Sequence, residues 1–185
     1  MKYLYILFLV FPFYISSQTW EFKNAYNDFD GAFKVASQIA SIGTNSIYKP
    51  RLVINSVNDG LTTNFYITDY GLVFDDLSVW LKFDNDDILY YARTTLSDDG
   101  KTIFIRDARD DDDDIFSKLE LYKKLESASR ISIRVQDKYS KNDYRFSLKG
   151  SSKAINQVVD FNSQIENIKL AKKLKEGTDS KVKVF

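Results

Sequence analysis

Hydrophobic and polar residues alternate along most of the chain after residue 50. This period of two is typical of β-strands that bury one face and expose the other. The clearest alternating runs are 52–54, 65–67, 79–83, 103–105, 131–135 and 144–148. Residues 20–26 and 32–39 predict a further pair of strands. Residues 88–96 are apolar on both faces, which predicts a strand that is covered on both sides.

No helices alternate with these strands, so the pattern predicts an all-β fold with accessory helices. We expect a single antiparallel β-sandwich of about nine strands. Residues that favour tight turns separate several of the runs, because Asp-Gly tolerates the positive φ that hairpin turns need. These predicted turns are Asn58-Asp59-Gly60, Asp98-Asp99-Gly100 and Lys141-Asn142-Asp143.

Two segments have helical spacing instead. The first predicts a crossover helix near 115–127, capped either by Asp113 or Asp114 or by a capping box of Ser117 and Glu120 that would begin the helix later. The second predicts a C-terminal helix near 153–175 that closes the open end of the core, with Gly177 as its stop.

The N-terminus has the order of charge, apolar run and small residues that is typical of a secretory signal. Lys2 precedes the apolar residues Tyr3 to Ile15, a run too short to cross a bilayer as a helix, and Ser16-Ser17-Gln18 suits cleavage after Ser17. A membrane anchor or a buried strand is the alternative. Export to the periplasm or the medium is therefore expected, with no transmembrane segment after cleavage.

The predicted organisation is a signal peptide followed by one domain and a helical C-terminus. Its parts are a signal peptide (1–17), a β-sandwich domain (18–152), a helix packing on that domain (153–176) and a flexible basic tail (177–185).

Composition excludes several kinds of chemistry. The chain has 26 Lys and Arg against 26 Asp and Glu, so its zero net charge gives no general attraction to nucleic acid. It has no His and no Cys, which removes Ser-His-Asp and Cys-His triads, disulfides and ordinary structural zinc. No set of residues is placed to polarise a bond, so we expect no catalytic residues.

Two acidic clusters are the candidates for metal or acid–base chemistry. Asp110, Asp112 and Asp114 are weak calcium ligands in a run of five Asp, although the spacing is not that of a calcium loop and a solvated loop is the simpler interpretation. Asp84 and Asp86 are the pair that a carboxylate-based hydrolase would need, but they also read as a hairpin turn.

Aromatic residues gather in the middle strands around Trp80. If exposed, they would form a binding surface for sugars or peptides, and if buried they are core. The candidates for such a surface are Tyr66, Tyr70, Tyr90 and Tyr91. The Lys-rich C-terminus would suit an anionic surface or an acidic partner, and a solvated helix end explains it equally.

Several strand motifs resemble those of small exported bacterial proteins. The segments concerned are 50–54, Trp80-Leu81-Lys82-Phe83-Asp84, Ser97-Asp98 with Phe104, 131–135, Tyr144 to Gly150 and Ala154-Ile155. They resemble type VI secretion accessory proteins of the VasI kind and the related invasion-associated locus B proteins, over residues 33–159. This chain lacks the two Cys that such proteins often carry, and Asn55 stands where one would fall.

The resemblance implies an antiparallel β-sandwich, no cofactor and an accessory role outside the cytoplasm. Together with the composition it predicts a non-catalytic exported protein that binds a protein or an envelope component, with its oligomeric state open. A carboxylate-based hydrolase of envelope polysaccharide and a weak calcium-dependent adhesive module are the alternatives.

Overall fold

The computed structural model describes residues 19–27, 31–42, 49–57, 62–70 and 76–179. Within these ranges the chain forms ten strands and three helices. The strands are β1 (Glu21–Asn27), β2 (Gly31–Ile39), β3 (Arg51–Val57), β4 (Thr62–Thr68), β5 (Ser78–Phe83), β6 (Leu89–Leu96), β7 (Thr102–Arg109), β8 (Ile115–Phe116), β9 (Arg130–Gln136) and β10 (Lys141–Ser147). The helices are α1 (Lys118–Ser127), α2 (Ser151–Val158) and α3 (Phe161–Asp179). The expected signal peptide, the turn at 58–60 and the end of the expected tail, 180–185, lie outside the described residues.

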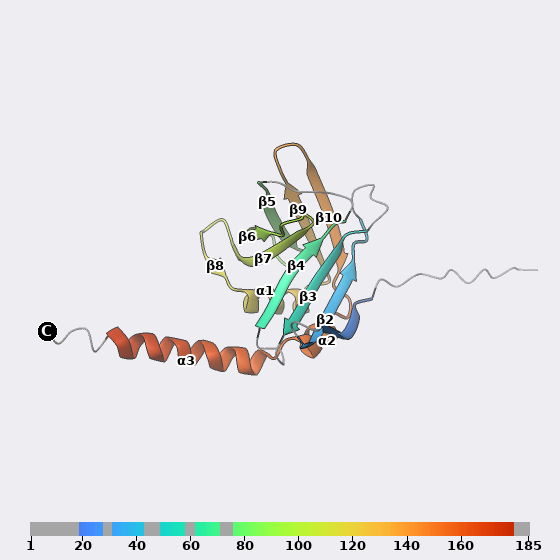
Figure 1. The fold of residues 1–185 in the computed structure, drawn as a ribbon. Helices are drawn as coiled ribbons and strands as arrows, with labels where there is room; N and C mark the ends of the chain where they lie inside the picture. The colour runs from blue at the N-terminus through green and yellow to red at the C-terminus, as the bar shows by residue number, and fades with distance from the viewer. Residues whose placement is uncertain (1–18, 28–30, 43–48, 58–61, 71–75, 180–185) are drawn as a thin grey trace, which may run out of the picture.

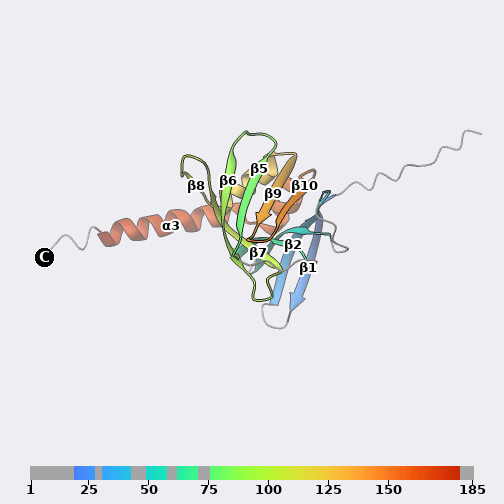
Figure 2. The same ribbon diagram turned by 90° about the horizontal axis from the view of Figure 1, so that it is seen from above.

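The strands are antiparallel and belong to one curled sheet, seen from two directions in Figures 1 and 2. Its order is β1-β2-β3-β4-β7-β6-β5-β9-β10, and the short β8 pairs with β7 outside this path. The sheet curls until β10 meets the chain that follows β2. There the Ser41 N–H donates to the Arg145 carbonyl at 2.7 Å, and the Arg145 N–H donates to the Ile42 carbonyl at 2.9 Å. The predicted all-β class is confirmed, and the facing layers are two parts of a single sheet.

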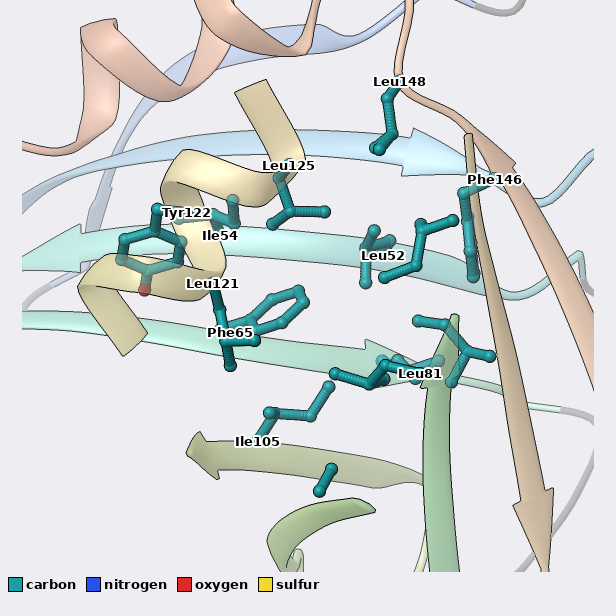
Figure 3. Packing of buried hydrophobic residues seen from close by; sticks show 14 of the residues in the cluster. Leu52, Ile54, Phe65, Leu81, Ile105, Leu121, Tyr122, Leu125, Phe146 and Leu148 are labelled. Carbon is teal, nitrogen blue, oxygen red and sulfur yellow. The ribbon is translucent and has the colours of Figure 1, made fainter. Parts of the chain in front are cut away.

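The core lies inside the curl, where alternate residues of the strands point. Figure 3 shows side chains of β3, β4, β5, β7 and β10 converging with those of α1. Fully buried members of this cluster include Leu52, Ile54, Phe65, Leu81, Ile105, Leu121, Leu125 and Phe146. Each contributes roughly 1.5–3 kcal/mol when it leaves water. In a chain without cysteine, this burial holds the sheet closed without a crosslink.

Helix α1 begins at the later of the two predicted positions. The Ser117 Oγ accepts the Glu120 N–H, and the Glu120 carboxylate accepts the Ser117 N–H at 2.7 Å, so the capping box forms. Residues 115–116 pair with β7 as β8 and leave no room for a helix start at Asp113 or Asp114.

The predicted C-terminal helix is two helices. Val159 has an extended backbone, and the Asp160 carboxylate accepts the N–H and the hydroxyl of Ser163 at 3.0 and 2.7 Å, which begins a new helix. Helix α2 packs against α1, β2 and β3 and closes one end of the curl. Helix α3 projects away from the sheet (Figure 1) and continues through Gly177 to Asp179, so the predicted stop at Gly177 is wrong.

Two of the three predicted turns lie within the described residues, and one of these two is confirmed. Gly100 has a φ of 69°, and Asp99 accepts the Ser97 hydroxyl and the Lys101 N–H in a tight turn between β6 and β7. The turn predicted at 141–143 is wrong, because these residues belong to β10. The chain instead reverses at 137–140, where the Asp137 carboxylate accepts two backbone N–H groups and a hydroxyl.

Replacing Tyr122 by Phe is expected to stabilise the protein. The Tyr122 side chain is fully buried, and its hydroxyl makes no hydrogen bond within the described residues. Burial raises the pKa of Tyr122, and the neighbouring Thr63 side chain only partly offsets this rise. Removing an unsatisfied buried hydroxyl should raise the free energy of unfolding by about 1 kcal/mol. Denaturant unfolding measures this. A destabilised Tyr122→Phe variant would mean that the hydroxyl has a partner.

Thermal stability should be constant from pH 6 to 8 and fall below about pH 4. The chain has no histidine to titrate in the upper range. Burial raises the pKa of Asp137, but its hydrogen bonds outweigh this and lower it, and the Arg134 guanidinium lowers the pKa of Asp143. A carboxyl whose pKa is lower in the folded protein stabilises it above the unfolded pKa and loses that contribution as the pH falls.

Melting temperatures measured from pH 2.5 to 8 check this expectation. The Asp137→Asn and Asp143→Asn variants should have a lower melting temperature at pH 7 and a shallower acid transition. A stability loss centred above pH 5 would contradict it.

Candidate functional site

A groove of about 410 Å³ crosses the outer face of β5, β9 and β10. Most of its lining consists of outward-facing side chains of these strands, with Leu89 of β6 and Ile42 among its apolar members. The remaining lining residues are Trp80, Lys82, Ser132, Ile133, Arg134, Gln136, Asp143, Tyr144 and Arg145. We call this feature the outer groove.

The period of two places these side chains. In β5, Val79, Leu81 and Phe83 are buried in the core, so Trp80 and Lys82 between them face outward. The same alternation in β9 and β10 turns polar and charged residues outward.

The strand register arranges most of the groove residues, with Tyr91 beside them, in two rows that run across the strands. In antiparallel pairs, residues directly opposite share a face with their Cβ atoms about 5 Å apart. The first, which we call the Ser132 row, is Leu89, Lys82, Ser132, Arg145 and Ile42. The second, the Trp80 row, is Tyr91, Trp80, Arg134 and Asp143.

Positive charge exceeds negative charge in the outer groove. Arg134 donates two hydrogen bonds to the Asp143 carboxylate, at 2.7 and 3.0 Å. This pair raises the pKa of Arg134 and lowers the pKa of Asp143. Lys82 and Arg145 have no ion-pair partner among the described residues. Three cations against one carboxylate leave a net charge of +2 in the groove.

The four tyrosines proposed as a binding surface do not share one surface. Tyr90 is fully buried, so its assignment to a surface was wrong. Strand β6 is covered on one face only, and it turns Leu89 and Tyr91 outward, with exposed fractions of 42% and 48%. Tyr91 packs edge-on against Trp80, with ring centroids 6.0 Å apart.

The other two tyrosines lie apart from this pair. Tyr66 packs against Phe104 across β4 and β7, with ring centroids 5.4 Å apart, and Tyr70 is exposed just beyond β4. Of the predicted set, only Tyr91 neighbours the outer groove, through its contact with Trp80.

Asp84 and Asp86 stabilise the junction between the sheet and α1. The Asp84 carboxylate accepts the N–H groups of Ser129 and Arg130 at 2.9 and 3.0 Å. The Asp86 carboxylate accepts hydrogen bonds from the Lys124 ammonium at 2.8 Å and from the Tyr90 hydroxyl at 2.9 Å. Neither acid lines the outer groove.

The Lys124 ammonium is surrounded by aromatic rings as well as by Asp86. It lies 4.8 Å from the ring centroid of Tyr90, 5.4 Å from that of Phe116 and 5.9 Å from that of Phe83. Burial lowers the pKa of Lys124, but its bonds to Asp86 and Tyr90 outweigh burial and the pKa is raised. The ammonium therefore stays charged and fastens α1 to the sheet.

The acidic loop is organised by its own backbone. The Asp110 carboxylate accepts the N–H groups of Asp112 and Asp114 at 3.1 and 2.9 Å, and Asp113 has a φ of 64°. Within the described ranges no three acidic side chains are placed to hold a metal ion. The geometry thus gives no support to calcium binding by Asp110, Asp112 and Asp114.

Sequence reasoning missed the basic residues of the outer groove. The alternation of polar and apolar residues predicts an outward position in a strand for each of them, Lys82, Arg134 and Arg145. Their proximity in space could not be predicted from the sequence, since β5 pairs with β9 and a hairpin and a helix separate these two strands along the chain.

Comparisons with known proteins give a fold and no family. No protein family profile matches the chain, and no curated protein matches it. The crystal structure of invasion associated protein B from Bartonella henselae is similar, with a TM-score of 0.50 and 12% identity over 76% of this chain and 91% of that chain. At this identity the likeness shows the fold alone. It supports the invasion-associated part of the resemblance at that level, and the VasI part receives no such support.

The helices of the described segments do not include one that is long and apolar enough to span a membrane.

Replacing Asp86 by Asn is expected to destabilise the protein by about 1–2 kcal/mol, because it removes the counter-charge of the half-buried Lys124. The exposed Asp87→Asn variant is the matched control and should differ from wild type by less than about 0.5 kcal/mol. Denaturant unfolding of the three proteins provides the comparison. Equal stability of wild type and Asp86→Asn would show that the Lys124 contact contributes nothing.

Proposed function

We propose that this chain is an exported, non-catalytic protein that binds an anionic component of the bacterial cell envelope through the outer groove. The order of residues in 1–17 supports export with cleavage after Ser17. An accessory role in a secretion system is one setting in which such binding would operate. N-terminal sequencing of the processed protein, with Gln18 expected as its first residue, tests the export step.

The observation that carries the proposal is uncompensated positive charge beside an aromatic side chain. Lys82 and Arg145 lie in the groove with no acidic partner among the described residues, and Trp80 lines the same groove. Charged groups on both sides of a groove attract a ligand of opposite charge, and a large aromatic ring adds contact area.

The same residues are poorly suited to catalysis. A general base works best when its pKa lies near the working pH, whereas the Arg134 guanidinium holds the pKa of Asp143 low. Ser132 cannot have a histidine base, because the chain contains none. We infer binding without turnover.

The double variant Trp80→Ala, Arg145→Gln should lose most of its binding to isolated cell envelopes, by about tenfold or more. The control is Tyr26→Ala, Lys123→Gln, which removes an exposed ring and an exposed charge remote from the groove and should bind like wild type. Cosedimentation of the mature protein with envelopes measures the bound fraction.

The same preparations test for turnover of envelope polysaccharide. Unchanged binding by the groove variant would overturn the proposal. Hydrolysis that is abolished by Asp84→Asn or Asp86→Asn in a folded protein would overturn it in favour of the hydrolase.

A further inference from the structure

We propose that the outer groove takes a segment of an acidic polysaccharide, with Lys82 and Arg145 binding its carboxylates and Trp80 packing against a sugar ring. This inference rests on the proposed function and specifies the class of ligand for the same site.

The Ser132 row provides the binding geometry. It runs from Leu89 through Lys82, Ser132 and Arg145 to Ile42. Adjacent strands lie about 4.8 Å apart, so the row is about 19 Å long and its two cations stand on strands about 10 Å apart. Its apolar ends are partly exposed, Leu89 by 42% and Ile42 by 51%. A chain of several sugar residues can therefore lie along the row and continue past either end.

The polar groups of the row match a sugar better than a hydrocarbon. Ser132 lies between the two cations and offers a hydroxyl that both donates and accepts hydrogen bonds. In the neighbouring row, Trp80 stands beside Arg134, whose guanidinium is already held by Asp143. A sugar ring presents C–H groups on its faces and hydroxyls around its edge, and a tryptophan beside hydrogen-bonding groups satisfies both.

A peptide strand fits this site less well. Peptides that extend a sheet use unpaired backbone groups at an edge. Strands β5 and β9 are each paired on both sides, and at Arg145 the edge of β10 is occupied by Ser41 and Ile42. Binding in the outer groove must therefore rely on side chains, which are mainly cationic and hydroxyl or amide groups.

The acidic character of the ligand follows from the charge. Lys82 and Arg145 face the same groove without a counter-ion among the described residues. In an extended polyuronate, alternate residues present their carboxylates on one side of the chain, so two cations in one row can bind two of them. Arginine forms paired hydrogen bonds with a carboxylate, which adds orientation to the attraction.

The test is calorimetric titration of the mature protein with three probes. They are a tetramer of galacturonic acid, the neutral galactose tetramer of equal length and a tetramer of glutamate. The galacturonate tetramer should bind, and its affinity should fall as salt rises from 50 to 300 mM because salt screens the exposed cations. The neutral tetramer should bind at least about tenfold more weakly.

Variants locate the site. Arg145→Gln and Lys82→Gln should each weaken galacturonate binding by about tenfold, the loss that follows from removing one charge-assisted hydrogen bond. Trp80→Ala should weaken binding of the galacturonate tetramer at 300 mM salt as well as at 50 mM. Lys123→Gln and Tyr26→Ala should bind like wild type. Trp80→Phe serves as the second variant if Trp80→Ala melts at a lower temperature.

The outcomes separate the ligand class from the proposed function. Binding of the glutamate tetramer alone, lost in Arg145→Gln, would overturn the polysaccharide and keep the groove. Equal affinity for the charged and neutral sugars would overturn the role of the cations. Envelope binding that is lost in the groove variants, with no binding of the galacturonate tetramer, would overturn this inference while the proposed function stands.

Discussion

The structure depends on the closure of one curled sheet at Arg145. Its backbone N–H and carbonyl bond to Ile42 and Ser41, so a strand from the end of the sheet order meets the chain that leaves β2. Closure gives the strands that surround the core an inner and an outer face. The inside becomes one continuous core without a crosslink, and the outside of β5, β9 and β10 becomes the outer groove. The Arg145 side chain lines the groove that its own backbone helps to form.

Local sequence predicted the strands well because burial on one face imposes a period of two. Local sequence failed where the structure depends on contacts with segments that are distant along the chain. Strand β6 has apolar side chains on both faces, so its sequence does not say which face is buried. The packing of Tyr90 determines this, through its contacts with Phe83, Phe116 and Lys124. The break at Val159 was missed because the cap made by Asp160 and Ser163 lies within a segment that otherwise reads as one helix.

The candidate site was the least predictable part, for the same reason. The Ser132 row takes residues from five separate segments, and two of its four contacts join segments that are far apart along the chain: Lys82 with Ser132, and Arg145 with Ile42. The acids that drew attention in the sequence have structural duties instead. Asp84 and Asp86 hold α1 on the sheet, and Asp110 orders its own loop. The acidic clusters that stand out in the sequence thus stabilise the fold. The unpaired cations of the groove, Lys82 and Arg145, are instead isolated residues far apart in the sequence.

Helix α3 has a mechanical consequence. It has 19 residues, so at 1.5 Å per residue its axis is about 28 Å long, comparable to the width of a small domain. Phe161 touches the core, and from there the helix leaves the body (Figure 2). A helix attached at one end acts as a spacer, because its length sets the distance of residue 179 from the point where Phe161 packs on the core.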